Sequence, residues 1–454
     1  MKKLVSIVLV LMLLLSLAAC GGPDTPSDEG TPSGDNGAST SDQKDKTDDA
    51  GGEKIKLSGT QLGYNDDQIA AAEAKEEGLT PHDEYYIAVR KTIEEEYPNY
   101  EVEYLDWGWA ETLDQKQRAA ITAGDPPSVV AGETFMPTYA NSGILEPLPQ
   151  DIVDAVNPSF LIKDKNGVPM AVAHKASIFM LFYNKKLLAD AGLDPEAEIK
   201  TWEDWQNAAR TVTEKGNGEV WGGGIPTFPH FGGSLRATPF FRQKGTDFGG
   251  GSEINLTDPK VIETLEFIRE MNAYFPAGLG NNADEGPLWE AFEKTQNIAF
   301  AVNGSWQAAG AERNNMDWGV APLPLPEGGQ IGNCMVGAVY VGVPKDAKNK
   351  EDAFNLIRAQ LKEENLKIWL EETVCVPLKS IIDNESLYAD NPTLKVAMEA
   401  FREGTYTGLT TFDKNDAQIW EIINTKVLAR VTMTNDPIDQ ICAEAQKEIE
   451  GLLK

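Results

Sequence analysis

The stretch Tyr100-Glu101-Val102-Glu103-Tyr104-Leu105-Asp106-Trp107 alternates between apolar and polar side chains, and this period of two predicts a β-strand. Residues 113–123 follow with the spacing of an amphipathic helix, which Gly124-Asp125-Pro126-Pro127 brings to an end. Residues 128–131 then form a short apolar run typical of a buried strand. A strand, a helix and a second strand in this order predict an α/β domain with a mostly parallel sheet.

The same alternation continues on both sides of this stretch. Strands are predicted at 55–58, 168–172, 178–183, 298–302 and 334–343, and helices at 83–97, 139–144, 257–273, 289–294, 350–370 and 435–453. A further helix begins after Thr201, because Asp204 stands three residues later, where the partner of a capping box lies. Residues 222–251 are rich in Gly, Pro and Phe, and this composition predicts long loops.

The first twenty residues predict a secreted lipoprotein. Lys2 and Lys3 precede the apolar run 4–19, which ends at Ala18-Ala19-Cys20-Gly21. Small residues before a cleavage point suit a signal peptidase, and the run is shorter than the ~20 residues of a membrane-spanning helix. The segment resembles a bacterial lipobox. The resemblance implies that residues 1–19 are a signal peptide and that Cys20 carries a lipid (diacylglycerol, palmitate) that holds the protein on the outer face of the cell membrane.

Composition limits the partners of the chain. Residues 21–53 are mainly Gly, Ser, Thr, Pro, Asp and Lys without large apolar side chains, so residues 20–53 are predicted to be a disordered tether. The 454 residues include 71 acidic and 40 basic side chains, for a formal charge of -31. This charge argues against nucleic-acid binding, which needs clustered Lys and Arg, and favours a solvated monomer.

No catalytic or metal-binding motif stands out in the sequence. His82, His174 and His230 are far apart and lack metal-ligand spacing, and the sequence has no Gly-x-Ser-x-Gly elbow and no Walker loop. We therefore expect no enzyme activity, no cofactor and no metal. A surface glycosidase stays an alternative hypothesis, which would require two carboxyl groups about 5–10 Å apart across a cleft. Besides Cys20 the chain has Cys334, Cys375 and Cys442, which form either three buried thiols or one disulfide of undetermined pairing.

Aromatic residues follow several of the predicted strands. Tyr64 comes shortly after the first strand, Trp107 and Trp109 end the second, and Trp306 follows the strand at 298–302. Because ligands of open α/β sheets bind outside the carboxyl ends of the strands, we expect these rings at the edge where a ligand sits. There they can stack on the apolar faces of sugar rings. The alternative for any single Trp is packing within a lobe.

Four sequence blocks carry a family resemblance. They are Asp125-Pro126-Pro127-Ser128-Val129-Val130 with 143–148, Phe182-Tyr183-Asn184-Lys185-Lys186-Leu187-Leu188 with 191–195 and 201–205, Ile298-Ala299-Phe300-Ala301-Val302-Asn303-Gly304-Ser305-Trp306, and Trp318-Gly319-Val320-Ala321-Pro322-Leu323-Pro324 with 342–345. In this order, behind a lipobox and a tether, they resemble the extracellular solute-binding proteins of family 1. This group includes the maltose- and multiple-sugar-binding proteins of bacterial ABC importers.

The resemblance implies a type II periplasmic-binding-protein-like α/β fold, with two hinged lobes and a ligand cleft between them. The implied N-terminal lobe is 54–172 plus 325–370, and the C-terminal lobe is 173–324 plus 371–454. The chain is then expected to cross between the lobes near 172–177, 322–326 and 371–377. The segment between Pro169 and Tyr183 is longer than in the maltose-binding relatives, which affects the placement of the first crossing.

The resemblance also implies a function. The protein captures a small solute, a sugar or oligosaccharide, and delivers it to the transmembrane subunits of an ABC importer. The candidate ligand-binding residues are Tyr64, Trp107, Trp109, Glu133, Trp221, Trp306 and Tyr340. An alternative is a protein of the same fold that binds a polyamine, favoured by cleft carboxylates without aromatics, or a phosphorylated polyol, favoured by clustered Arg and Lys.

Overall fold

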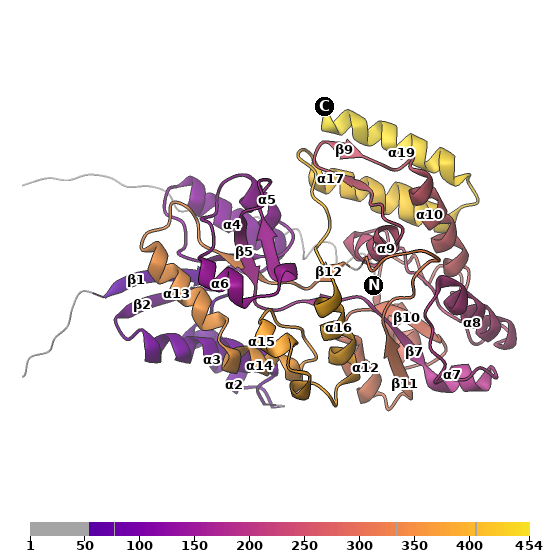
Figure 1. Cartoon of the computed structure of the whole chain (residues 1–454), viewed down its shortest axis with the longest axis horizontal. Coiled ribbons are helices and arrows are strands. Elements are labelled where there is room, and N and C mark those ends of the chain that lie inside the picture. The colour runs from indigo at the N-terminus through magenta and orange to yellow at the C-terminus, as the bar shows by residue number, and fades with distance from the viewer. Residues whose placement is uncertain (1–53, 77, 333, 405) are drawn as a thin grey trace, which may run out of the picture. The chain divides into compact units, whose positions relative to one another are not determined.

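The computed structural model describes residues 54–454 except 77, 333 and 405. Residues Gly52–Lys454 form one compact unit. Cys20, the predicted signal peptide and the predicted tether lie outside the described residues. Within the compact unit the strands gather in two main groups, each with its own helices, and these groups are called the first and second lobes (Figure 1).

A mixed sheet forms the centre of the first lobe. Its strand order is β2-β1-β3-β13-β5-β4, because a parallel bridge between Gly59 and Val129 joins β1 to β3. These strands are β1 Ile55–Thr60, β2 Tyr100–Leu105, β3 Val130–Gly132, β4 Leu161–Lys163, β5 Pro169–Ala173 and β13 Tyr340–Gly342. The helices of this part of the chain are α2 Asp66–Glu73, α3 Pro81–Glu96, α4 Ala110–Thr122, α5 Met136–Asn141, α6 Gln150–Ala155, α13 Lys350–Gln360 and α14 Glu363–Glu371.

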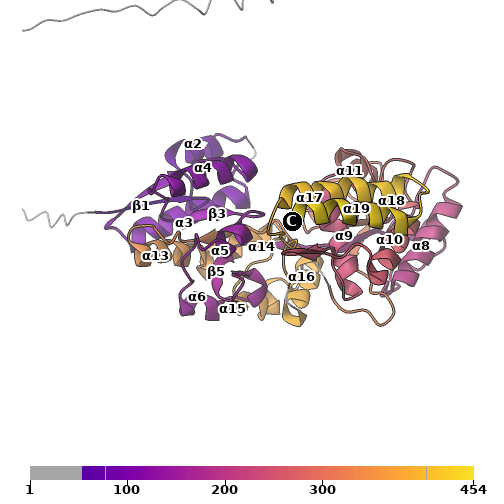
Figure 2. The ribbon, with the colours of Figure 1, turned by 90° about the horizontal axis from the view of Figure 1, so that it is seen from above.

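A smaller sheet forms the centre of the second lobe, with the order β10-β7-β11. Its strands are β7 Met180–Asn184, β10 Phe300–Asn303 and β11 Trp318–Ala321. The surrounding helices are α7 Lys185–Asp190, α8 Trp202–Lys215, α9 Phe231–Gln243, α10 Pro259–Asn272, α11 Gly286–Glu293, α12 Gln307–Arg313, α16 Pro392–Glu403, α17 Asp416–Ile422, α18 Arg430–Met433 and α19 Ile438–Leu453, with a π-helical turn at Ile423–Ala429. Figure 2 shows α17, α18 and α19 side by side over this lobe. Short elements complete the fold at β8 Gly249–Gly250, β9 Glu253–Ile254 and α15 Lys379–Ile382.

Three chain segments meet where the lobes join. The short strand β6 (Ser177–Ile178) pairs with β12 (Met335–Val336), and Ala176 forms an antiparallel bridge with Cys375. Leu325, in the expected second crossing at 322–326, instead bonds through its backbone to Lys200 at the start of α8. We therefore propose that the second crossing lies at 334–339, and the other lobe boundaries stay predictions.

The prediction of a mostly parallel sheet is wrong. Within the described residues β1 and β2 are parallel, whereas β13 is antiparallel to both β3 and β5, and β7 is antiparallel to both β10 and β11. The reason is the crossing of the chain between the lobes. When the chain returns from the other lobe, its next strand begins at the edge of the sheet that faces that lobe. Neighbouring strands that end at this edge are therefore antiparallel to it.

Several helix predictions are confirmed, and two are corrected. Thr201 caps α8, as the capping box predicts. Its hydroxyl accepts a hydrogen bond from the Asp204 backbone N–H, and the Asp204 carboxylate accepts one from the Thr201 backbone N–H. The predicted loop at 222–251 contains α9, which begins after His230 and includes Pro239. Nearly all of α9 is buried, so tertiary packing outweighs its unfavourable composition. The single helix predicted at 350–370 is two helices, α13 and α14, because the buried Asn365 amide bonds the Ala359 carbonyl at the break.

No helix among residues 54–454 that the structure describes is both long enough and apolar enough to span a bilayer. The three cysteines in this range are buried, and no disulfide joins them. Among the same residues no His, Cys, Asp and Glu side chains gather in a group of three or more that could hold a metal.

Candidate ligand-binding site

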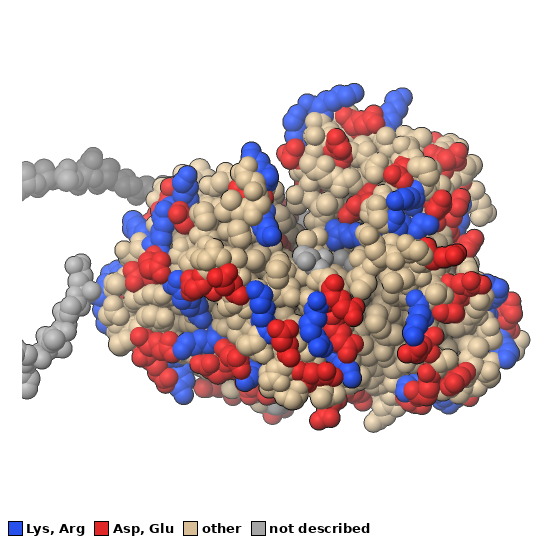
Figure 3. Space-filling view, viewed as in Figure 1, with Lys and Arg blue, Asp and Glu red and all other residues tan. Residues whose placement is uncertain are grey.

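In each lobe, the ends of the strands next to the chain crossings form one edge of the sheet. These two edges are called the first and second edges. The first edge consists of the carboxyl ends of β1, β2, β3 and β5 and the start of β13, because Tyr340 pairs with both Gly132 and Ala173. The second edge consists of the end of β10 and the start of β7, where Asn303 pairs with Met180. Figure 3 shows a notch in the surface between the two lobes.

Three predicted residues follow the ends of β1 and β2. Tyr64 is half-buried, and its ring stacks on Tyr86 at 5.3 Å while its hydroxyl donates to Asp83 at 3.1 Å. Trp107 is half-buried, and Trp109, at the start of α4, is 41% exposed. Gly108 adopts a φ of 82°, so the turn between the two Trp residues requires the left-handed backbone that glycine supplies. Tyr64 is therefore engaged in packing, whereas Trp109 is largely available to a ligand.

Glu133 and Tyr340 meet at the centre of the first edge. The Glu133 carboxylate accepts a hydrogen bond from the Gly337 backbone at 2.8 Å, which ties the end of β3 to the segment between β12 and β13. Burial raises the pKa of Glu133, against the opposing effect of its backbone hydrogen bonds. Tyr340 is only 6% exposed, which leaves little of its ring for a ligand.

Lys175 lies beside Glu133 and was not among the predicted residues. Its ammonium stands 3.8 Å from the ring centroid of Trp369, which is fully buried. Burial lowers the pKa of Lys175 to about 8, and the nearby carboxylates of Glu372 and Glu133 oppose this effect. No local motif marks this arrangement, since Trp369 comes from α14, far along the chain. The Lys175 ammonium group is thus a positively charged hydrogen-bond donor at the first edge.

His174, directly before Lys175, makes the fold sensitive to acid. Its ring is fully buried and stacks on Tyr85 at 5.0 Å, and neither ring nitrogen has a hydrogen-bond partner among the residues that the structure describes. Burial, Lys175 and His82 hold the pKa of His174 well below its usual range. The folded protein thus keeps this imidazole neutral, whereas the unfolded chain takes up a proton as the pH falls through ~6.5.

We predict that His174→Phe reduces the loss of stability between pH 7.5 and pH 5.5. The contribution of His174 is fully present above its unfolded pKa and is lost below it, by about 1.4 kcal/mol at pH 5.5. Phenylalanine keeps the stack on Tyr85 and cannot be protonated. The free energy of unfolding in urea, measured for both proteins at both pH values, checks this. Equal losses in the two proteins would show that His174 does not carry the effect.

At the second edge Trp306 is the most exposed of the predicted aromatics, at 46%. A Cβ added to Gly304 would lie 2.2 Å from the Trp306 ring, so the absence of a side chain at Gly304 makes room for the indole. The neighbouring Ser305 bonds through its backbone and its hydroxyl to Ser177 of β6, each at 3.0 Å. Trp306 is thus fixed beside the first crossing with one ring face free.

Trp221 does not join the other predicted residues. It is half-buried and forms a bridge with Ile298, ahead of the start of β10. Since Asn303 ends β10 at the second edge, Trp221 lies at the opposite end of this sheet. Its place directly before the Gly-rich stretch 222–251 did not indicate which end of the sheet it would reach.

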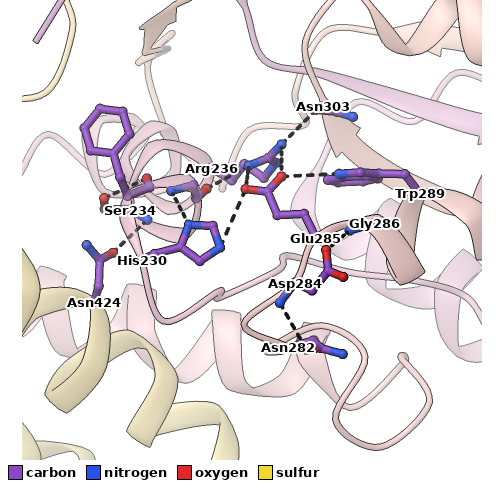
Figure 4. A network of polar contacts seen from close by, with 12 residues as sticks. His230, Ser234, Arg236, Asn282, Asp284, Glu285, Gly286, Trp289, Asn303 and Asn424 are labelled. Carbon is purple, nitrogen blue, oxygen red and sulfur yellow. Dashed lines mark hydrogen bonds and ion pairs between the residues drawn. The ribbon is translucent and has the colours of Figure 1, made fainter. Parts of the chain in front are cut away.

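An ion pair between a buried Arg236 and a partly exposed Glu285 supports the second edge (Figure 4). The Arg236 guanidinium is 5% exposed and lies 4.9 Å from the ring centroid of Trp289, with the rings of Phe179 and Phe228 on other sides. It binds the Glu285 carboxylate at 3.0 Å and donates to the Asn303 side chain at 3.0 Å.

Glu285 connects further residues of this network, as Figure 4 shows. Its carboxylate also accepts from the Trp289 indole at 3.2 Å and lies 3.8 Å from His230. His230 caps α9 by accepting from the Gly232 backbone. The network therefore fixes α9, α11 and the end of β10 relative to one another. The sequence did not indicate it, since Arg236 stands in a predicted loop.

Residues 65–367 match the model of a family described as bacterial extracellular solute-binding protein. The chain belongs to this family. The predicted family and the two-lobed type II α/β fold of this solute-binding protein are thereby confirmed.

Several other solute-binding proteins are similar in sequence to this chain. The diacetylchitobiose binding protein DasA of Streptomyces coelicolor is 24% identical over 66% of this chain and 70% of its own length. The sn-glycerol-3-phosphate-binding periplasmic protein UgpB of Pectobacterium atrosepticum is 24% identical over 62% of this chain and 67% of its own. The maltodextrin-binding protein MdxE of Bacillus subtilis is 23% identical over 53% of this chain and 56% of its own length.

Solved structures share the fold of the solute-binding protein. The cyclic α-maltosyl-1,6-maltose binding protein of Arthrobacter globiformis superimposes with a TM-score of 0.69 at 19% identity, over 88% of this chain and 99% of that one. UgpB of Mycobacterium tuberculosis, solved with glycerophosphocholine, gives a TM-score of 0.65 at 21% identity, over 82% of this chain and 97% of that one.

Proposed function

We propose that this solute-binding protein captures a sugar or oligosaccharide between its lobes and delivers it to the transmembrane subunits of an ABC importer. The observation that carries the proposal is the exposure of Trp109 and Trp306 at the first and second edges. Each indole keeps more than two fifths of its surface in water, although burial of a Trp is strongly favourable. Such rings gain their burial when a sugar stacks on them.

The alternative of a phosphorylated polyol has support from UgpB, a relative of this chain that is named for binding sn-glycerol 3-phosphate. The charges at the two edges favour a neutral ligand over an anionic one. Lys175 stands near Glu133 and Glu372, and Arg236 is paired with Glu285, so each cation already has a carboxylate close by. An anion would have to compete with these carboxylates. A polyamine would have to compete with Lys175 and Arg236 for the carboxylates of Glu133 and Glu285.

A thermal-shift screen of residues 52–454 tests the proposal. Mono- and oligosaccharides are compared with glycerol 3-phosphate and with polyamines, at several concentrations. A ligand that binds only the folded state raises the melting temperature with its concentration. We expect a rise with one class of saccharide. A rise with glycerol 3-phosphate or a polyamine alone, and none with saccharides, would replace the carbohydrate proposal by the alternative.

We further propose that the protein is anchored through a lipid on Cys20 and acts as a monomer without catalytic activity. The supporting observations are the lipobox-like sequence and the tether composition of residues 20–53. Full-length protein and a Cys20→Ser variant would be separated into membrane and soluble fractions of the producing bacterium. We expect only the Cys20→Ser variant to lose the lipid. Soluble, unmodified wild-type protein would contradict the anchor.

A further inference from the structure

A cavity of about 580 Å³ lies in the second lobe, next to the start of β7 and the end of β11. It is named the α16 cavity, because α16 forms one wall and the end of β11 with the following segment 322–325 forms another. None of the seven sequence-predicted ligand residues lines it. Its volume falls within the range of small-molecule sites in proteins. The proposed sugar site therefore does not account for it.

The lining combines an apolar body with one unsatisfied polar group. Ile178, Leu323 and Ala400 contribute apolar surface, and Tyr183 and Tyr406 contribute aromatic rings. Tyr406 is 2% exposed, and its hydroxyl has no hydrogen-bond partner in the described part of the chain. Since buried hydroxyls in native proteins are nearly always bonded, this one indicates a missing partner.

The charges around the cavity are mainly negative. Glu196 and Glu198 pair with Lys185 and Lys200, respectively. Glu399 and Glu403, both on α16, form no ion pair with any described residue. The cavity thus presents two uncompensated carboxylates beside aromatic rings, and both features attract cations.

We propose that the α16 cavity binds an organic ammonium ion with an apolar or aromatic body. The body lies against Ile178, Leu323 and Ala400. The ammonium group lies near the carboxylates of Glu399 and Glu403, and the Tyr406 hydroxyl accepts a hydrogen bond from a donor of the ligand. This site is independent of the saccharide site and of its identity.

Three soluble probes of similar shape and different charge test the proposal. Residues 52–454 are titrated at pH 7 with 2-phenylethylamine, 2-phenylethanol and 3-phenylpropionate, and binding is followed by calorimetry or by NMR of the probe. We expect the amine to bind with a dissociation constant of roughly 1 mM or below, and to bind at least about threefold more tightly than the alcohol and more tightly still than the anion. Equal binding of amine and alcohol, or no amine binding at about 10 mM, would overturn the proposal.

Variants locate the site. The double change Glu399→Gln and Glu403→Gln keeps the shape and should weaken amine binding roughly threefold to tenfold. Glu421→Gln, an exposed carboxylate on α17, is the matched control and should leave amine binding unchanged. Ala400→Trp fills the cavity and should abolish binding, with circular dichroism as the test of folding. Unchanged binding in the double variant, or in a folded Ala400→Trp protein, would show that the amine binds elsewhere.

Discussion

Glu285→Leu is expected to destabilise the protein by about 3 kcal/mol or more, because it leaves a buried Arg236 without its carboxylate. The guanidinium is enclosed by three aromatic rings and cannot turn to water without disrupting them. The remaining acceptors, the Gly232 carbonyl and the Asn303 side chain, are neutral. Calorimetric unfolding of wild type and variant measures the change in melting temperature.

A substitution on α11, the helix that Glu285 precedes, is the control. Glu290→Leu removes a carboxylate that is 61% exposed and pairs with Lys294 on the surface, so its effect should stay below about 1 kcal/mol. The double variant Arg236→Met and Glu285→Leu should recover most of the lost stability, since no unpaired charge remains. If Glu285→Leu and Glu290→Leu behave alike, the ion pair does not hold α9, α11 and β10 together.

Local signals in the sequence predicted the elements that depend on neighbouring residues. The capping box at Thr201 and Asp204 places the start of α8, and the Pro259 position after Asp258 places the start of α10. Both depend on a few residues in one turn, so their chemistry is complete in the local sequence. The strand predicted at 298–302 from its apolar run overlaps β10, which ends at Asn303.

The remaining features depend on contacts between distant segments. Helix α9 contains two consecutive glycines and Pro239, and it is stable because the second lobe buries it. Lys175 and Trp369 come together only after the chain has crossed between the lobes and returned. The antiparallel direction of β13 has the same cause. Residue patterns do not contain this information, because it depends on which edge of a sheet each segment enters.

Trp306→Ala is expected to weaken binding of the solute found in the screen by roughly tenfold or more, because a Trp that is buried by a ligand typically contributes about 2 kcal/mol. The indole is 46% exposed without ligand, so the variant should unfold at nearly the wild-type temperature. Trp306→Phe keeps a ring for stacking and should lose less affinity. Calorimetric titration of each protein with that solute measures the dissociation constants.

Met433→Ala is the matched control, since Met433 is 65% exposed on α18 and borders neither edge. It should leave the dissociation constant unchanged. Wild-type affinity in the folded Trp306→Ala protein would mean that the indole covers Gly304 without touching the solute. In that case Trp109, the other exposed indole, becomes the residue to replace next. If Trp306→Ala and Trp109→Ala both bind normally, the exposed rings do not stack on the ligand, and the preference for a sugar over a charged solute loses its main structural support.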